Sequence, residues 1–524
     1  MQSDPSEVYA TNRQAVVPCH GREYKKTTKT CTCVVCKNLS LGGDMTDYSV
    51  YDNPLVTRYA CREMAELWGP QRKFSTWRRL WVALAEAQHE LGLKADDGVM
   101  PRITDVQLDE LRAHVDDIDF ALAQELEKKF HHDVVSHIHA YGEVCPSASG
   151  IIHLGATSCY VTDNTDLLLM REALGLVRNR LARIIDALAQ FAEEHRNLRT
   201  LGFTHFQPAQ LTTVGKRACL WCYDFVLDLH EVEQRLATLR FRGAKGTTGT
   251  QASFLELFRG DHQKVLQLDT LVARKMGFAT VYPVTGQTYS RKVDSQILDV
   301  LSGIAQSAHK FGTDLRPLAH RQEVEEFFEA DQVGSSAMPY KRNPMRAESM
   351  CGLARFVMTL AASAAQTAAT QWLERTLDDS SNRRLTLPQS FLGTDAILEL
   401  AFRLARRMVV NPQVIARNVD LALPYMATED ILMAAAARGG DRQKLHAKIR
   451  EHSLAVTQLL KSGNQNNDLL ERLQAEPDFA GINLGRILQD RNFVGRAPEQ
   501  VTEFIAQEIG PIRERYANLL ATSS

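Results

Sequence analysis

Apolar residues recur along the middle of the chain in alternating steps of three and four. The clearest series run through residues 167–191 and 293–318, and looser ones cover residues 214–239 and 345–373. Such spacing places the apolar side chains on one face of a helix, which other helices must then cover. Helices of about thirty residues are roughly 45 Å long. The pattern therefore predicts a bundle of long helices that can also pack against partner subunits in a homo-oligomer. Candidate N-caps of the first series are Thr162, Asp163 and Asn164.

Shorter helical segments are predicted on both sides of this bundle. Apolar side chains share one face of residues 74–91, a helix that Gly92 would end, and Pro101 precedes an acidic start of another. After residue 411 the segments are again short, with a break expected at Pro424. No strand-rich stretch stands out. The sequence thus predicts an all-α fold of three helical domains, comprising residues 47–157, 158–410 and 411–524.

Residues 1–46 lack a sustained apolar period and are predicted to form a disordered N-terminal extension. The segment contains Cys31, Cys33 and Cys36, with Cys19 and His20 upstream, which is enough thiols for a zinc site. Because no second well-spaced pair accompanies the cluster, we favour the disordered extension over a metal site.

Composition narrows the class of protein. The formal net charge is −2, and basic residues are interspersed with acidic ones, so no nucleic-acid or membrane partner is expected. Residues 356–373 are uncharged and of transmembrane length, but hydroxyls and amides among alanines favour a helix packed against other helices. No apolar segment occurs in the first thirty residues, and the ten cysteines have no disulfide rhythm. A cytoplasmic protein with reduced thiols is expected.

The segment from Gly334 to Pro344 has the composition of a catalytic loop. Its small residues permit a tight backbone, and Pro339 and Pro344 keep it out of the flanking helices. The loop places hydroxyls beside the ammonium of Lys341 and the amide of Asn343, a set able to bind a carboxylate and stabilise an ionised alcohol. Composition alone would also allow a polar interhelical turn.

Two histidine-containing segments can supply proton transfer. In residues 202–210, the imidazole of His205 can give or take a proton and is flanked by Thr204 and Gln207, while Pro208 is expected to start the next helix. In the second segment, His132 precedes Asp133, which could orient its imidazole. A metal cluster with His137 and His139 is the alternative for this segment, and we disfavour it because no acidic or thiol ligand lies at a familiar spacing.

Three further segments are rich in groups that bind anions. Residues 375–384 are dense in arginine, serine and acidic side chains, residues 54–59 contain Arg58 and Tyr59, and residues 246–251 form a glycine-hydroxyl loop. Taken alone, residues 375–384 are better explained by a solvated helix turn, and glycine-threonine loops such as residues 246–251 are common in proteins of any function.

The order of residues in the 334–344 loop resembles the signature of the fumarase/aspartase superfamily, whose members eliminate fumarate from succinyl-bearing substrates. With residues 155–164, 285–289 and 424–429, the chain is similar from about residue 51 onward to the branch that cleaves succinylated purine nucleotides, in its animal form. The resemblance implies a cofactor-free and metal-free lyase acting on small nucleotide substrates. It also implies a homotetramer in which three subunits build each active site.

The resemblance further implies a role for individual residues. Ser335 would be the base, His205 the acid that protonates the leaving nitrogen, and His132 its support. The residues implied in substrate binding are Arg58, Tyr59, His131, Asp133, Thr157, Ser158, Thr204, Gln287, Lys341, Asn343, Arg375, Ser380 and Arg384.

Two positions depart from the superfamily branch, and two other functions remain open. His131 stands where an arginine is frequent, and Ser349 where an arginine or asparagine is frequent, which could alter the ranking of the two nucleotide substrates. One alternative is another fumarate-releasing relative, such as argininosuccinate lyase or fumarase. The other is a catalytically silent scaffold, whose simplest sign would be loss of His205 or Ser335, and both are present.

Overall fold

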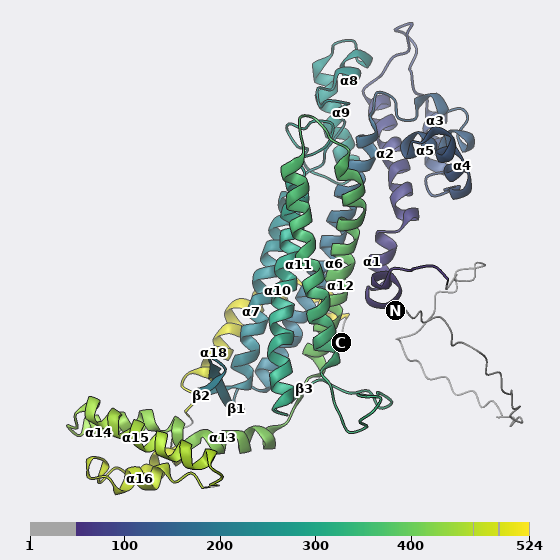
Figure 1. Ribbon diagram of the computed structural model, residues 1–524. Coiled ribbons are helices and arrows are strands. Elements are labelled where there is room, and N and C mark those ends of the chain that lie inside the picture. The colour runs from purple at the N-terminus through teal and green to yellow at the C-terminus, as the bar shows by residue number, and fades with distance from the viewer. Residues whose placement is uncertain (1–48, 465, 491–492, 523–524) are drawn as a thin grey trace, which may run out of the picture. The chain divides into compact units, whose positions relative to one another are not determined.

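The computed structural model describes residues 49–464, 466–490 and 493–522 (Figure 1). The predictions made for residues 1–46, including Cys31, Cys33 and Cys36, lie outside the described residues. The chain divides into two units, residues 1–52 and 53–524, and the description below concerns the second.

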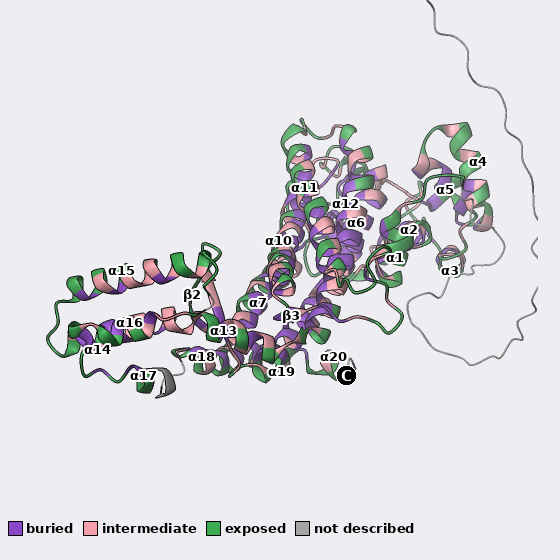
Figure 2. Ribbon diagram, turned by 60° about the horizontal axis from the view of Figure 1, so that its bottom comes forward, coloured by how far each residue is buried: buried purple, intermediate pink, exposed green. Residues whose placement is uncertain are grey.

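Five long helices form the central bundle of this unit. They are α6 (Ser158–Glu194), α7 (Val214–Thr238), α10 (Lys292–His320), α11 (Met345–Thr370) and α12 (Asp378–Arg407). Helix α6 packs against α7 and α12, and α10 packs against α7, α11 and α12. Figure 2 shows their buried residues facing one another inside the bundle. The apolar periods therefore predicted the bundle correctly, and the all-α fold class is confirmed.

Helix α6 begins at least five residues earlier than its predicted caps imply. Thr157 occupies the N-cap position, whereas Asp163 and Asn164 lie inside the helix and are buried. Asp163 accepts a hydrogen bond from the Tyr289 amide (3.0 Å), and Asn164 accepts one from the Arg242 amide (3.0 Å). These side chains bind distant segments rather than the end of their own helix, so the cap prediction is wrong.

A β-hairpin separates α6 from α7, although no strand was predicted. Strands β1 (Arg199–Thr204) and β2 (Gln207–Thr213) pair antiparallel, leaving His205 and Phe206 as a two-residue turn. Both turn residues have positive φ, 50° and 60°, as a type I′ turn requires. Pro208 therefore lies in β2, and α7 begins after Thr213, whose hydroxyl accepts from the Lys216 amide (3.0 Å). The prediction that Pro208 starts the helix is wrong because this turn lacks the usual glycine or asparagine signal.

The segments before and between the bundle helices are shorter than those helices, the longest of them having 21 residues. Before α6 they are η1 (Leu55–Tyr59), α1 (Arg62–Leu67), α2 (Pro70–Glu90), α3 (Asp105–Ala113), α4 (Phe120–Phe130), α5 (Asp133–Val144) and η2 (Ser149–Ile151). Between α7 and α10 they are α8 (Ala252–Leu257) and α9 (His262–Lys275). A second small sheet pairs β3 (Val324–Glu325) with β4 (Val409–Val410). The predicted helix over residues 74–91 and the acidic helix start near residue 105 are both present.

The C-terminal segments divide between two hydrophobic cores. They are α13 (Pro412–Met426), α14 (Thr428–Ala437), α15 (Arg442–Lys461), α16 (Leu469–Ala475), η3 (Pro477–Phe479), α17 (Leu484–Asp490), α18 (Ala497–Phe504), η4 (Ile505–Ile509), α19 (Gly510–Arg515) and α20 (Ala517–Ala521). Buried residues from Ala427 to Leu484 form their own cluster, whereas α18 and α19 join the core of the bundle. Pro424 lies in the last turn of α13, and the break expected there follows two residues later, between Met426 and Thr428. The three-domain division stays a prediction.

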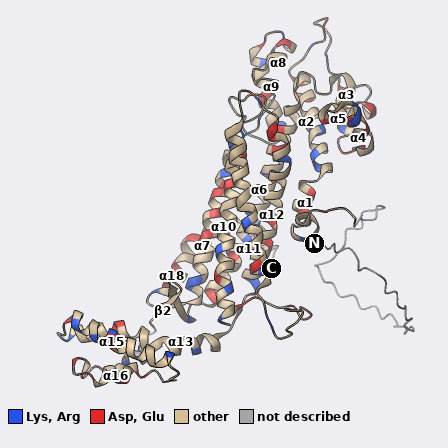
Figure 3. Cartoon of the chain, viewed as in Figure 1, with Lys and Arg blue, Asp and Glu red and all other residues tan. Residues whose placement is uncertain are grey.

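Charge is distributed along the helices in both signs. Figure 3 shows basic and acidic residues interspersed along the helices of the bundle. None of the helices in the described part of the chain combines the length and apolar character that spanning a membrane requires.

Candidate active site

A pocket of about 830 Å³ lies where three helices begin. Ser158 starts α6, Asp133 starts α5, and Asp379 and Ser380 belong to the first turn of α12. Helix N-termini present unpaired amide groups and partial positive charge, so their convergence favours an anionic ligand. Eight of the predicted site residues line the pocket: His131, His132, Asp133, Ser158, Gln287, Arg375, Ser380 and Arg384.

The imidazole of His132 is oriented by the start of α5. The Val135 amide donates to its Nδ1 (3.3 Å), and its Nε2 faces the Ser158 hydroxyl (3.4 Å). A neutral ring that accepts at Nδ1 carries its proton on Nε2 and donates it toward Ser158. Asp133 lies 3.8 Å from the same Nδ1, beyond hydrogen-bond distance, and accepts from Arg384 (2.8 Å). The hydrogen bond that orients the ring therefore comes from a backbone amide.

Two further histidines of α5 pack against aromatic rings. His137 stacks on Phe74 with ring centroids 3.8 Å apart, and burial lowers its pKa to about 4. His139 stacks on Phe130 at 4.8 Å. Ring packing accounts for both side chains.

The loop before α12 closes one wall of the pocket. Arg375 donates to the thiol of Cys159, whose pKa is raised to about 11 by burial. The backbone amide of Gln287 donates to the backbone carbonyl of Glu374 (3.0 Å). A Cβ at Gly286 would lie 2.6 Å from that carbonyl, so the close approach of the two loops requires glycine there.

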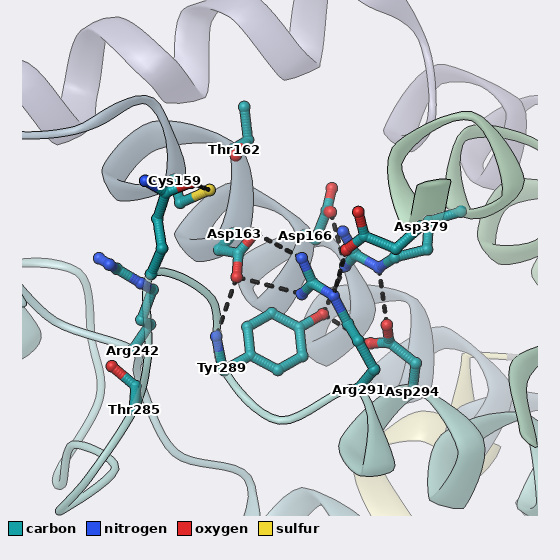
Figure 4. Close-up of polar contacts among 12 residues, drawn as sticks. Cys159, Thr162, Asp163, Asp166, Arg242, Thr285, Tyr289, Arg291, Asp294 and Asp379 are labelled. Atoms are coloured by element: carbon teal, nitrogen blue, oxygen red, sulfur yellow. Dashed lines mark hydrogen bonds and ion pairs between the residues drawn. The ribbon is translucent and has the colours of Figure 1, made fainter. Parts of the chain in front are cut away.

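A buried network of two arginines and four carboxylates supports the pocket, and sequence analysis missed it (Figure 4). Arg291 binds Asp379 (Nε to Oδ2, 2.6 Å) and both oxygens of Asp163 (3.1 Å each). Arg383 binds Asp166 (2.8 Å) and Asp294 (2.7 Å). The available signal was Asp163 and Asp166, two acids three residues apart beside the apolar stripe of α6.

Ionisation within this network follows from burial and pairing. Burial raises the pKa of Asp166, whereas the guanidinium of Arg291 helps hold the pKa of Asp163 low despite its burial. The acidic partners raise the pKa of Arg291 and of Arg383 despite their burial. The two guanidinium groups are thus fixed cations that carboxylates of the same chain already compensate.

The predicted acid and base lie far from this pocket within one chain. Ser158 lines the pocket at the first residue of α6, a helix of 37 residues, and β1 begins only five residues after its last. At 1.5 Å per residue the helix is roughly 55 Å long. Arg291 likewise precedes α10, whereas the 334–344 loop follows the other end of that helix. Figure 1 shows β1 and β2 at the opposite end of the bundle from α5.

The remaining predicted site residues also lie outside the residues that line the pocket. Thr204 and His205 are exposed beside Phe206, whose side chain is 75% exposed. Arg58 and Tyr59 belong to η1, which packs against α12. The others in this group are Thr157, Ser335, Lys341 and Asn343.

The 334–344 loop is held by its own polar groups. The backbone amide of Met338 donates to the Ser335 hydroxyl oxygen (3.2 Å), and the side-chain amide of Asn343 donates to the Gly334 carbonyl (3.0 Å). Tyr340 is 83% exposed. Hydrogen bonds within the loop therefore fix its two ends, while the residues between them are exposed and can contact another subunit.

The hairpin that carries His205 is anchored from several elements. Gln210 donates to Glu429 of α14 (2.5 Å), and the Arg321 guanidinium lies 5.1 Å from the Phe203 ring centre. Arg217 of α7 donates to the Leu201 carbonyl. Glu429 belongs to the segment 424–429, one of those that carry the family resemblance, so this segment contacts the hairpin of His205.

This helical bundle, with its helix-terminus pocket and remote glycine-serine loop, defines a lyase of the fumarase/aspartase superfamily. Residues 61–359 match the family described as lyase. Among solved structures, the 3-carboxy-cis,cis-muconate lactonizing enzyme of Pseudomonas putida superposes with a TM-score of 0.73 at 22% identity, covering 87% of this chain and 99% of that one. A fumarate lyase from a Mesorhizobium species gives 0.72 at 22% identity, covering 87% and 100%.

Within this class, the chain belongs to the adenylosuccinate lyase family. Residues 424–504 match the family described as adenylosuccinate lyase C-terminus. The adenylosuccinate lyase of Schizosaccharomyces pombe is 49% identical over 469 residues, which is 89% of this chain and 96% of that protein. The adenylosuccinate lyase of Schistosoma mansoni is 45% identical over 484 residues, covering 92% and 99%.

Proposed function

We propose that this protein is a cytoplasmic carbon-nitrogen lyase that releases fumarate from adenylosuccinate, giving AMP. We extend the proposal to succinylaminoimidazole-carboxamide ribotide, which would give aminoimidazole-carboxamide ribotide in purine nucleotide synthesis. The observation that carries this proposal is identity of 45–49% to proteins named adenylosuccinate lyase over nearly their full lengths.

The pocket's chemistry fits the three anionic groups of such substrates. Helix N-termini and the side chains of Arg375, Arg384 and Ser380 offer donors to phosphate and carboxylate. In the proposed arrangement, Thr157 and Ser158 bind the succinyl carboxylates, while Arg58 and Tyr59 join the phosphate end. His131, Asp133 and Thr204 complete the binding set, and Gln287, Lys341 and Asn343 contact the fumarate side.

The proposed reaction is a β-elimination with an alkoxide base. Ser335, as its alkoxide, removes the proton from the succinyl carbon adjacent to the one bonded to nitrogen. The electrons form the fumarate double bond, the C–N bond breaks, and His205 gives a proton to the leaving nitrogen. A serine hydroxyl is a poor base, so the Met338 amide and the nearby Lys341 ammonium would stabilise the alkoxide. His132 would support substrate or the acid.

We infer that a complete site needs more than one subunit. The pocket is separated by roughly the length of α6 from His205 and by roughly the length of α10 from Ser335, distances that loop motion cannot close. A homotetramer in which neighbouring copies bring these segments to the pocket satisfies this geometry. Exposure of the hairpin turn and the 334–344 loop supports the same arrangement.

Fumarate release by purified, metal-stripped protein tests the proposed function. Adenylosuccinate and argininosuccinate are offered in parallel, and release is expected from adenylosuccinate alone. Release from argininosuccinate alone would favour the alternative lyase activity. Release from neither, by protein shown to be tetrameric, would favour a catalytically silent scaffold.

Mixed tetramers test whether subunits share each site. His205→Ala and Arg375→Ala proteins are each expected to have little activity, because every site of either lacks one group. After denaturation and reassembly as an equal mixture, about one quarter of sites should receive both native residues, since each is supplied with a probability of about one half by a different subunit. Fumarate release by the mixture measures this recovery. A mixture no more active than its components would contradict a site shared between subunits, provided reassembled wild type regains activity.

A further inference from the structure

The ammonium of Lys73 lines the pocket and has no assigned role. Lys73 lies near the start of α2, and its Nζ sits 5.2 Å from the ring centre of Phe74 and 5.3 Å from that of Trp77. Within residues 49–464, 466–490 and 493–522, no carboxylate forms an ion pair with this ammonium, and no group hydrogen-bonds it. The aromatic rings hold the side chain in place but cannot neutralise it fully.

The arginines around Lys73 already have carboxylate partners. Arg383 binds Asp166 (2.8 Å), and Arg384 binds Asp133 (2.8 Å). The charged groups that shift the pKa of Lys73 are Asp166, Arg384, Asp133 and Glu127. Asp166 and Asp133 are each paired with an arginine, and Glu127 of α4 is exposed. Lys73 is thus a pocket cation that has no ion-pair partner of its own among the described residues.

We propose that Lys73 binds the phosphate group of the nucleotide, next to Arg384. This inference rests on the proposed function and adds a residue to its binding set. Phosphate is favoured over a succinyl carboxylate because Lys73 is close to Arg384, whereas Ser158 and Gln287 are the groups assigned to the succinyl end. An ammonium acts on phosphate as a compact charge, complementing the planar guanidinium beside it.

Burial supports this role. Burial lowers the pKa of Lys73, and the neighbouring Arg384 lowers it further, while Asp166 and Asp133 raise it. A phosphate dianion at the ammonium would oppose the first two effects and favour the charged lysine. Binding of phosphate and protonation of Lys73 therefore reinforce each other.

Calorimetric binding of AMP and adenosine, which differ only in the phosphate, tests the inference. Wild type, Lys73→Met and Lys73→Arg are compared as full-length proteins. Lys73→Met keeps the unbranched apolar stem and removes the charge. We expect it to weaken AMP binding by roughly 10- to 100-fold, the loss typical of one hydrogen bond to a charged group, with adenosine binding unchanged. Lys73→Arg should restore most of the preference for AMP.

Lys129→Met is the matched control. Lys129 makes the same kind of ring contact, 5.3 Å from the centre of Phe130, but does not line the pocket. The Lys129→Met variant should bind AMP and adenosine as the wild type does. Equal weakening of AMP and adenosine by Lys73→Met, or no weakening of either, would overturn the phosphate role. Fumarate release by the same wild-type sample tests the proposed function separately, because the binding comparison does not depend on turnover.

Discussion

Replacement of His205 by alanine is expected to lower kcat by about 10²- to 10⁴-fold, the contribution typical of a positioned general acid. The chain should still fold and assemble. His205 is exposed at the hairpin turn, and no described group hydrogen-bonds its ring, so alanine removes no buried contact. Alanine at its φ of 50° suffers the same kind of backbone strain as histidine. Steady-state fumarate release and sedimentation of the variant provide the two measurements.

His262→Ala serves as the control for this substitution. His262 is an exposed histidine at the first position of α9, outside the residues that line the pocket and outside the hairpin. Its replacement should leave kcat unchanged. Near-normal turnover in His205→Ala would remove His205 from the acid role, and a variant that fails to assemble would point to a structural role for the hairpin turn instead.

Replacement of Arg291 by methionine is expected to destabilise the fold by about 3–5 kcal/mol, the usual cost of breaking a buried ion pair. Arg291 is 3% exposed and binds two carboxylates, Asp163 and Asp379. Methionine fills much of the volume but leaves both carboxylates buried without this cation. Urea unfolding followed by circular dichroism, at one fixed protein concentration, measures the loss.

The exposed pair Arg62–Glu66 provides the comparison. These side chains are 67% and 61% exposed and lie four residues apart on α1. Solvent screens such a pair, so Arg62→Met should cost only a small fraction of the loss at Arg291. Equal losses for the two variants would show that the pocket network contributes no more than a surface contact.

Asp163→Asn combined with Arg291→Met should recover part of the loss in unfolding free energy, because one uncompensated charge is removed with its partner.

Local patterns predicted the helices because apolar spacing records which face each helix buries. Residues 293–318 follow this spacing, and α10 spans Lys292–His320. The same reasoning failed at the hairpin, since strands β1 and β2 are short and the turn His205–Phe206 has no glycine. At Asp163, a polar residue near a helix start was interpreted as a cap, although its actual partner is Arg291, 128 residues away.

The sequence by itself determined the helical fold class, the loop between α10 and α11 and, through its resemblance, the family of lyases. These features depend on residues close together in the chain, where spacing and local chemistry are sufficient. Only the tertiary structure decided which predicted residues meet. It grouped His132, Ser158 and Arg384 in one pocket and placed His205 and Ser335 at the other end of the bundle. The buried arginine network and the place of Lys73 in the pocket also emerged only there, because contacts between distant segments leave no periodic trace in the sequence.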